Sequence, residues 1–295
     1  MSSVLRKEAN RQARPMKLAT PSFILHKLEQ KEFHLLLLLL DYDGTLVPIQ
    51  RNPKRAILSE SVRTLLHVLA HHPRVRLAVM SGRSCTDLKK LVQVPDVIYV
   101  GNHGAEIWMN NRIFIDPQAK KAQSLLKAVH KGLATKLQYL RGILIEDKGL
   151  TLTVHYRNMR KGRVKDIKAA LAETLSELGG ETKLEIRQGK KSLEIRPLGA
   201  RTKGDAALWI VRMSSGESAP SRPCTTWRSK AAVIAIGDDR TDEDMFLDLP
   251  SNAITIHVGK GGQSSARFRL KSSRSVRELL AGVERLLRES NSNES

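Results

Sequence analysis

A run of six leucines, Leu35 to Leu40, restricts the fold of this chain more than any other feature of the sequence. A short segment that is apolar on both faces is typical of a strand inside a parallel sheet, whereas a membrane crossing needs about 20 apolar residues. We therefore expect an α/β fold with a Rossmann-like parallel sheet and no membrane span. Binding sites in such sheets lie beyond the carboxyl ends of the strands, so the residues that follow Leu40 are the first candidates.

The leucine run ends in Asp41-Tyr42-Asp43-Gly44-Thr45, which admits two interpretations. Asp and Gly are common in turns, so the motif can be a plain turn at a strand end. Alternatively, the two carboxylates belong to an active site, in which Gly44 permits a sharp turn and the Thr45 hydroxyl holds a phosphate or orients a carboxylate. The second interpretation requires other strand ends to supply partners for the two acids.

The net charge of the chain favours anionic partners. Its 295 residues include 50 Lys and Arg against 30 Asp and Glu, a net charge of +20, which favours nucleic acid, an acidic membrane surface or phosphorylated substrates. Only 4% of the residues are aromatic, and the sequence has no recognisable nucleic-acid-binding motif, so we expect no nucleic-acid partner. Cys85 and Cys224 match no zinc or redox spacing, which indicates a reducing, cytoplasmic compartment.

Two further strand ends carry groups that suit a phosphate or a sugar. The predicted strand Val75 to Met80 ends in Ser81-Gly82-Arg83-Ser84, a turn that directs N–H groups and a hydroxyl toward a phosphate, unless it is an ordinary helix cap. A third strand, residues 96–100, precedes Gly101-Asn102-His103-Gly104-Ala105-Glu106. This loop is typical of a binding loop in which Glu106 accepts hydrogen bonds from sugar hydroxyls, although His103 can equally satisfy local backbone groups. Residues 107–115 predict a β-hairpin.

Residues 117–196 have a different pattern, which predicts an α+β cap inserted between two halves of a core, residues 31–116 and 197–288. The predicted order is helix, strand, helix, strand, strand, with strands at 151–156, 184–187 and 192–196, and one face of their sheet is polar. Charged residues on this face are either solvated or in contact with a substrate. The candidates for substrate contact are Arg157, Lys190, Glu194 and Arg196.

The last long strand of the core leads into a dense cluster of acids. Residues 233–236 predict a buried strand, and Gly237-Asp238-Asp239-Arg240-Thr241-Asp242-Glu243-Asp244 follows. Five carboxylates within seven residues repel one another unless a cation lies between them, and Mg²⁺ prefers such oxygen ligands. The alternative is an exposed, solvated acidic turn. Lys203 opens a predicted helix, where the helix dipole and the ammonium group both favour an anion.

Three segments are expected to lie outside the folded body of the protein. Residues 1–30 are basic and lack the apolar core of a secretory signal, so they predict a flexible tail. Residues 213–230 have the composition of a long surface loop, and residues 289–295 predict a frayed C-terminus.

The order of these motifs along the chain resembles that of the haloacid dehalogenase (HAD) superfamily of phosphotransferases. The resemblance rests on Asp41-x-Asp43-Gly44-Thr45, then Ser81, then Lys203, then Gly237-Asp238-Asp239 with Asp242, and the inserted module looks like the second (C2) cap type. Within the superfamily, the passages 101–106, 155–157 and 237–246 resemble the trehalose-6-phosphate phosphatase family. Thr202 departs from the pattern, because relatives commonly have an acid before the Lys-Gly pair.

The resemblance implies a Mg²⁺-dependent phosphatase that hydrolyses trehalose 6-phosphate to trehalose and phosphate through an aspartyl-phosphate intermediate. It implies Asp41 as nucleophile and Asp43 as general acid and base. The phosphoryl oxygens would be bound by Ser81 and Lys203. The implied magnesium ligands are Asp41, the backbone carbonyl of Asp43, Asp238 and, in support, Asp242. The implied substrate-binding residues are Thr45, Gly82, Arg83, Asn102, His103, Glu106, Arg157, Lys190 and Glu194.

Related functions stay open at this point. Phosphatases acting on sucrose phosphate or mannosyl-phosphoglycerate share the same aspartates, and a hexose phosphomutase with an Asp-x-Asp-Gly-Thr start differs in releasing no free phosphate. A catalytically silent sugar-phosphate sensor has little use for a nucleophile beside an acid. Beyond the sugar phosphate itself, trehalose-6-phosphate synthase is the expected partner.

Overall fold

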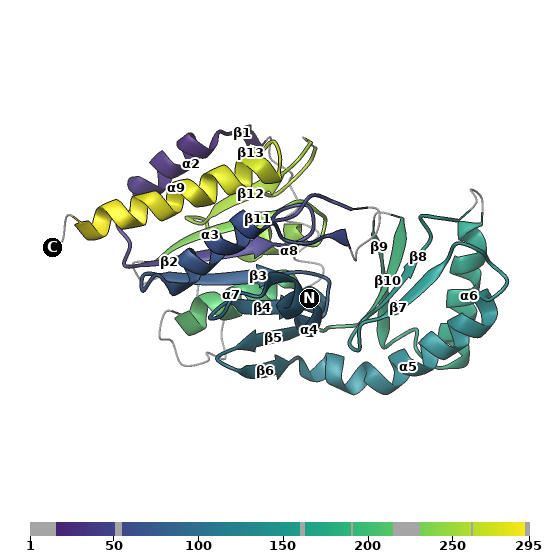
Figure 1. Cartoon of the computed structure of the whole chain (residues 1–295). Coiled ribbons are helices and arrows are strands. Elements are labelled where there is room, and N and C mark those ends of the chain that lie inside the picture. Colours follow the sequence, from purple (N-terminus) through teal and green to yellow (C-terminus); the bar gives the residue numbers. More distant parts are fainter. Residues whose placement is uncertain are drawn as a thin grey trace.

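The computed structural model describes residues 16–50, 55–159, 163–189, 191–214, 231–260 and 262–292. Within these residues the chain forms a nine-stranded sheet covered by helices on both faces, and a four-stranded sheet with its own two helices at one end of the first (Figure 1). The α/β core with an inserted α+β cap, as the sequence predicts, is confirmed.

The large sheet is parallel except at one edge. Its strands lie in the order β1-β13-β12-β11-β2-β3-β4-β5-β6, and the antiparallel pairs are β4 with β5 and β5 with β6. The strands are β1 (Lys17–Leu18), β2 (Leu35–Asp41), β3 (Val75–Met80), β4 (Ile98–Gly101), β5 (Glu106–Met109), β6 (Arg112–Ile115), β11 (Ala231–Gly237), β12 (Ile254–Val258) and β13 (Phe268–Leu270). The predicted hairpin at 107–115 is therefore confirmed as β5 and β6.

The leucine run lies at the middle of this sheet. β2 pairs with β3 on one side and β11 on the other, so both of its faces are covered. Leu36, Leu38 and Leu40 point into one apolar core, whereas Leu37 and Leu39 point into the core on the opposite face. Burying each leucine side chain contributes about 2 kcal/mol. Because both faces of the strand are buried, this gain applies to every position, and polar and apolar residues do not alternate.

Helices cover the two faces unequally. α2 (Pro21–Glu29), α3 (Glu60–His71), α4 (Cys85–Val92) and α9 (Ser273–Ser292) contribute to the first core. α7 (Lys203–Ser214) and α8 (Asp242–Asp248) contribute to the second. Figure 1 shows the strands stacked from β1 at the top to β6 at the bottom, with α2, α9 and α3 overlapping the upper strands. Both α7 and α8 begin at the edge of the sheet where β2 and β11 end.

The predicted flexible tail over residues 1–30 is wrong for residues 17–29. β1 pairs in parallel with β13, and α2 packs Ile24 and Leu28 into the core beside α9. Helix α2 starts cleanly because Thr20 Oγ1 accepts from the backbone N–H of Phe23 at 3.2 Å. In the sequence, exposed basic residues obscure the few apolar positions through which this short helix packs on the core. Residues 1–15 lie outside the described part of the chain.

The C-terminal helix and the predicted surface loop also differ from expectation. α9 continues to Ser292, beyond the predicted end at residue 288, so fraying is wrong for residues 289–292. Residues 213 and 214 complete α7, and the rest of the predicted loop lies outside the described residues. In the described part of the chain, no helix has the length and apolar character that a membrane crossing requires.

The cap is built from residues between β6 and α7. Its elements are α5 (Pro117–Leu137), β7 (Leu144–Asp147), β8 (Leu152–His155), α6 (Val164–Glu177), β9 (Leu184–Gly189) and β10 (Ser192–Pro197). The antiparallel sheet has the order β7-β8-β10-β9, one strand more than predicted, because β7 is added at an edge. One face of the sheet packs against α5 and α6 through Leu152, Val154, Leu193 and Ile195. The other face carries polar side chains.

Candidate active site

The parallel register brings the predicted strand-end motifs to one edge of the core sheet. Asp41 is the last residue of β2, Ser81 follows β3, and Asp238 follows β11. Because β2 lies between β3 and β11, these three positions are neighbours. Lys203 is the first residue of α7, which covers one face of the sheet, and its side chain reaches Asp41 at the end of β2.

A buried lysine joins two of the acids. Lys203 Nζ donates to Asp41 Oδ1 and to Asp242 Oδ1, at 2.6 Å in each case. All three side chains are buried. Burial opposes the charge on Lys203, but the carboxylates of Asp242, Asp41 and Asp239 outweigh it and raise the pKa of Lys203, which therefore stays an ammonium ion. Burial likewise raises the pKa of Asp41 well above its ordinary value and that of Asp242 to about 7, against the opposing charge of Lys203.

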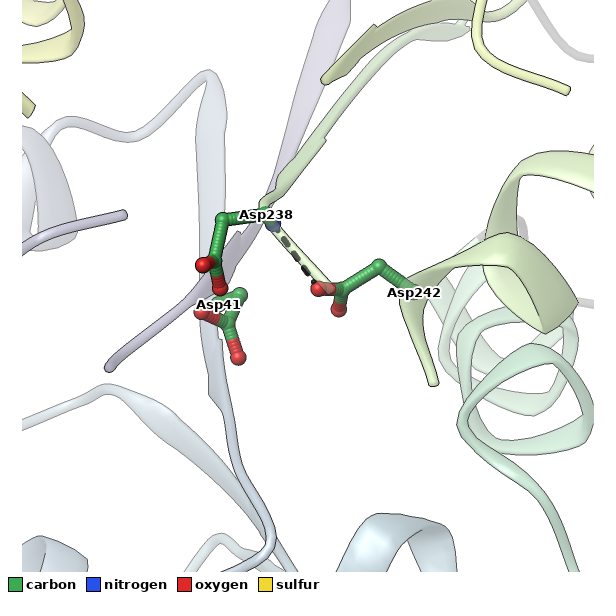
Figure 2. A group of neighbouring side chains, drawn as sticks. All are labelled: Asp41, Asp238 and Asp242. Carbon is green, nitrogen blue, oxygen red and sulfur yellow. Dashed lines mark hydrogen bonds between the residues drawn. The ribbon is translucent and has the colours of Figure 1, made fainter. Parts of the chain in front are cut away.

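Asp41, Asp238 and Asp242 form a carboxylate cluster that fits a divalent cation. Each offers an oxygen within 4.8 Å of the others, and Figure 2 shows them converging from the end of β2, the end of β11 and the start of α8. Asp41 Oδ2 is buried without a hydrogen-bond partner among the described residues. Carboxylates gathered at one point repel one another unless a cation lies between them, and a hard, oxygen-seeking ion such as Mg²⁺ fits such a set.

Asp242 is engaged differently from the other two acids. Its Oδ2 accepts from the backbone N–H groups of Asp238 and Asp239 at 2.9 and 3.0 Å, while its Oδ1 accepts from Lys203. Gly237 is required here, because a Cβ at this position would lie 2.1 Å from the Asp242 carboxyl carbon. Asp242 thus fixes Asp238 and Lys203 in addition to its place in the carboxylate cluster.

Asp43 is held by an arginine. Arg83 Nε and Nη2 donate to the two Asp43 oxygens at 2.7 Å each, and Ser81 Oγ lies 3.4 Å from Asp43 Oδ2. The turn beneath Asp43 needs Gly44, whose φ is +101° and whose Cβ would lie 2.3 Å from the Asp238 carboxylate. Thr45 is fully buried, and its hydroxyl has no partner within the described chain.

Glu106 and Asn102 form hydrogen bonds that hold the loop between β4 and β5. Glu106 Oε1 accepts from the Cys85 N–H and from Asn102 Nδ2, both at 2.8 Å. Asn102 also bonds to the cap, accepting from Thr151 Oγ1 at 2.8 Å and donating to the Lys148 carbonyl at 3.2 Å. These bonds fix the loop and its junction with the cap, and the sugar contact of Glu106 stays a prediction.

A row of polar side chains on the cap lies opposite this edge. Strand register places Glu146, Thr153, Glu194 and Arg187 side by side across β7, β8, β10 and β9. Glu194 Oε1 lies 2.6 Å from His103 Nε2 in the core, and Arg187 Nη1 donates to Asp244 Oδ2 at 3.1 Å. The polar face of the cap sheet thus contacts the core at two points.

Sequence reasoning found some of the cap residues and missed others. Arg157 is exposed in the turn after β8, and Lys190 lies outside the described residues. Glu146 and Lys148 were not predicted. Glu146 Oε2 lies 2.8 Å from His155 Nε2, a hydrogen bond that lowers the pKa of Glu146, and the charge of Glu146 acts on Arg83. A strand-like Leu-Ile-Glu-Asp segment between Gly142 and Gly149 was the available signal for β7.

Comparison with known proteins places the site in a family. Residues 39–274 match the trehalose-phosphatase family. Trehalose-phosphate phosphatase B of Arabidopsis thaliana is 31% identical over 225 residues, which cover 72% of this chain and 56% of the relative. The trehalose-6-phosphate phosphatase C-terminal domain of C. albicans is 26% identical, with a TM-score of 0.73 and coverage of 92% of this chain and 99% of that one.

The shared fold extends beyond close relatives. A haloacid dehalogenase-like hydrolase from Bacteroides thetaiotaomicron, at 17% identity, superposes with a TM-score of 0.56 over 85% of this chain and 99% of that chain. The chain spans 56% to 66% of the length of the Arabidopsis relatives it matches. The match over residues 39–274, with the ordered strand-end motifs inside it, shows that this chain belongs to the trehalose-phosphatase family.

Proposed function

We propose that this protein is a Mg²⁺-dependent phosphatase that hydrolyses trehalose 6-phosphate to trehalose and phosphate. The observation that carries the proposal is the buried Asp41 carboxylate, one oxygen of which is held by Lys203 at 2.6 Å while the other has no partner in the described chain. An oxygen fixed in position and left without a donor is suited to attack phosphorus. Membership of the trehalose-phosphatase family supports the choice of substrate.

In the first step, Asp41 Oδ2 attacks phosphorus, and the bond from phosphorus to the sugar oxygen breaks. The departing oxygen takes a proton from Asp43. In the second step, a water molecule attacks the aspartyl-phosphate, gives its proton to Asp43, and releases phosphate from Asp41. One carboxylate forms the bond and the other moves the proton, so each needs its own environment.

Asp43 must leave Arg83 before it can act as an acid. While both of its oxygens accept hydrogen bonds from Arg83 at 2.7 Å, the carboxylate is an acceptor without a proton to give. The charge of Glu146 also acts on Arg83 from the cap. A cap that moves Glu146 closer to Arg83 would therefore weaken the hold on Asp43.

Charge on the transferred phosphoryl group is met by groups already in place. The Lys203 ammonium and the Ser81 hydroxyl would bind its oxygens. Mg²⁺ would be held by Asp41, Asp238 and the backbone carbonyl of Asp43, with Asp242 fixing Asp238 and Lys203. The ion would supply positive charge against the phosphoryl oxygens and favour the ionised form of Asp41. The reaction is expected in the cytoplasm, and association with trehalose-6-phosphate synthase stays a prediction.

Phosphate release from a panel of phosphorylated sugars tests this function. The panel contains trehalose 6-phosphate, sucrose 6-phosphate, mannosyl-3-phosphoglycerate and glucose 6-phosphate, each with Mg²⁺ or with EDTA. We expect release from trehalose 6-phosphate that EDTA abolishes and added Mg²⁺ restores. Preference for another sugar phosphate would reject the substrate but keep the chemistry, and interconversion without free phosphate would reject hydrolysis.

A further inference from the structure

The loop that precedes β5 connects the phosphoryl site to the cap. Three consecutive residues in it have positive φ: Asn102 at 48°, His103 at 55° and Gly104 at 109°. Its backbone is tied to the turn after β3, because Asn102 N donates to the Arg83 carbonyl at 2.7 Å and His103 N to the Ser81 carbonyl at 3.0 Å. A backbone held in sparsely populated conformations by several contacts is typical of functional sites.

The same loop packs against the start of α7. A Cβ at Gly104 would lie 2.2 Å from the Thr202 carbonyl oxygen, immediately before Lys203. The loop therefore touches both chain segments that carry the predicted phosphate-binding groups. Its side chain at position 103 points the other way, toward the cap.

The His103 imidazole is wedged between the phosphate turn and a cap carboxylate. A Cβ on Gly82 would lie 2.2 Å from His103 Nε2, so the ring lies directly on that turn. The same nitrogen is 2.6 Å from Glu194 Oε1, and the two side chains are only 11% and 10% exposed. A buried carboxylate next to a single ring nitrogen has little freedom to rotate, so His103 restricts where Glu194 points.

Glu194 is held as a carboxylate by its surroundings. Burial opposes ionisation, but the interaction with His103, which includes a hydrogen bond, and the charges of Arg196 and Lys148 lower the pKa of Glu194 to about 2. An ionised carboxylate accepts hydrogen bonds from sugar hydroxyls strongly, provided that its oxygens are aimed at them. Because the surroundings keep Glu194 ionised, a neighbouring side chain can still control the direction in which its oxygens point.

We propose that His103 is a positioning residue: it fixes Glu194 of the cap for contact with the sugar and thereby links sugar recognition to the phosphoryl-binding turn. The inference rests on the proposed function for its substrate. His103 belongs to the core and Glu194 to the cap strand β10, so the contact exists only when the cap lies against the core as in this structure. His103 does not touch the reacting atoms in this role.

Two substitutions of His103 distinguish a role in positioning Glu194 from a role in stabilising the fold. His103→Asn keeps a residue type that tolerates the left-handed backbone, but its side chain is too short to reach Glu194. His103→Gln restores length and a donor. The matched control is His26→Asn on α2, whose side chain is 65% exposed and distant in sequence from the site.

Kinetics with two substrates test the positioning role. For His103→Asn we expect the KM for trehalose 6-phosphate to rise about tenfold, the size of one lost charged hydrogen bond, while kcat/KM for p-nitrophenyl phosphate changes less than about twofold. His103→Gln should recover part of the loss. In a Glu194→Gln background, His103→Asn should add nothing, because the group it positions is gone. Equal losses on both substrates, or additive losses in the double variant, would overturn the proposal.

A measurement without substrate tests the contact between His103 and Glu194 independently of the proposed function. In protein labelled with ¹⁵N at histidine, the His103 Nε2 resonance should move in Glu194→Gln and not in Lys136→Gln, which alters only the far side of the cap. An unmoved resonance removes the contact on which the proposal stands. If the wild type releases no phosphate from trehalose 6-phosphate, the substrate assignment fails, and the same variants are measured on the sugar phosphate that it does hydrolyse.

Discussion

The core edge and the polar face of the cap sheet, which meet at the site, differ in how many of their buried polar atoms are hydrogen-bonded. At the core edge, Lys203 is bonded to two carboxylates, and Asp242 accepts hydrogen bonds with both of its oxygens. On the cap face, buried polar atoms of Thr153 and Arg196 have no hydrogen-bond partner within the described residues. The carboxylates and the lysine of the first region are largely bonded, with Asp41 Oδ2 and Thr45 Oγ1 as exceptions within the described residues, whereas the second region has polar groups that a ligand would complete.

This difference indicates a division of labour. A network whose members are already bonded is preorganised for charge that develops during a reaction. Buried polar groups without partners cost free energy in the empty protein and recover it when a ligand supplies the missing hydrogen bonds. We therefore expect substitutions at the core edge to affect turnover on any phosphate ester, and those on the cap face to affect sugar binding.

We expect Asp41→Asn to lower activity more than any substitution on the cap face. A smaller loss would contradict the proposed difference between the core edge and the cap face. Loss of the nucleophile should lower kcat by about 10³-fold or more on trehalose 6-phosphate and on p-nitrophenyl phosphate alike. The melting temperature should stay unchanged or rise, because Lys203 keeps Asp242 as its partner and a buried charge is removed. The measurements are phosphate release and a thermal melt, with Asp166→Asn on the cap helix α6 as control. Residual turnover above one tenth of wild type would exclude Asp41 as nucleophile.

The charge on Glu194 predicts a pH-dependent contribution to stability. Its pKa in the folded protein is about 2, below the ordinary 4.5, so its stabilising effect is present above pH 4.5 and disappears as the pH falls toward 2. The full contribution is about 3 kcal/mol. Urea unfolding at pH 6 and pH 3 should show that Glu194→Gln loses less stability on acidification than the wild type does. Equal losses would mean that Glu194 is not held as a carboxylate by the cap face.

The sequence predicted the core edge better than the cap face for a physical reason. Asp41 and Asp238 each follow a strand of continuous apolar residues, and the carboxyl ends of parallel strands meet at one edge without further information. Ser81, which follows β3, reaches that edge by the same rule, whereas Lys203 reaches it from the start of α7. Their clustering therefore follows from local patterns, although their precise roles stay proposals.

The cap face depends on register between strands that are distant in sequence. Glu146, Thr153 and Glu194 become neighbours only through the pairing of β7, β8 and β10, which local periodicity cannot supply. The short edge strand β7 was missed, and Glu146 with it. The bond from the Cys85 backbone to Glu106 could not be predicted either, because it depends on how β4 and β5 turn. Helix α2 was missed because its stability comes from packing on α9.

The ion pair between Arg187 and Asp244 sharpens the comparison by joining the two regions. Arg187 lies on the cap strand β9, and Asp244 on α8 of the core, with the closest atoms 3.1 Å apart. A double-mutant cycle of Arg187→Gln and Asp244→Asn should give a coupling of about 0.5–1 kcal/mol, because Arg187 is partly exposed to solvent. Lys136 and Glu177, which pair at 2.8 Å within the cap, supply the matched control.

The coupling should appear in KM as well as in the free energy of unfolding. Breaking the core–cap pair lets the cap spend less time against the core, so KM for trehalose 6-phosphate should rise two- to threefold, in keeping with a coupling of this size. Breaking Lys136–Glu177 should leave KM unchanged. Coupling in the unfolding free energy without any change in KM would mean that this contact does not influence the cap position during catalysis.

Thr153 offers the smallest and most discriminating test of the idea that the cap face awaits a ligand. Its hydroxyl is buried, has no partner in the described chain, and lies beside Glu194 in the strand register. Thr153→Val keeps the shape and removes the polar atom. If the hydroxyl is unsatisfied without substrate, the valine variant should gain about 0.5–1 kcal/mol of stability, measured by urea unfolding, and raise the KM for the sugar phosphate severalfold. Loss of stability would instead show that the hydroxyl is satisfied in the empty protein, and the contrast between the two regions would then fail at this position.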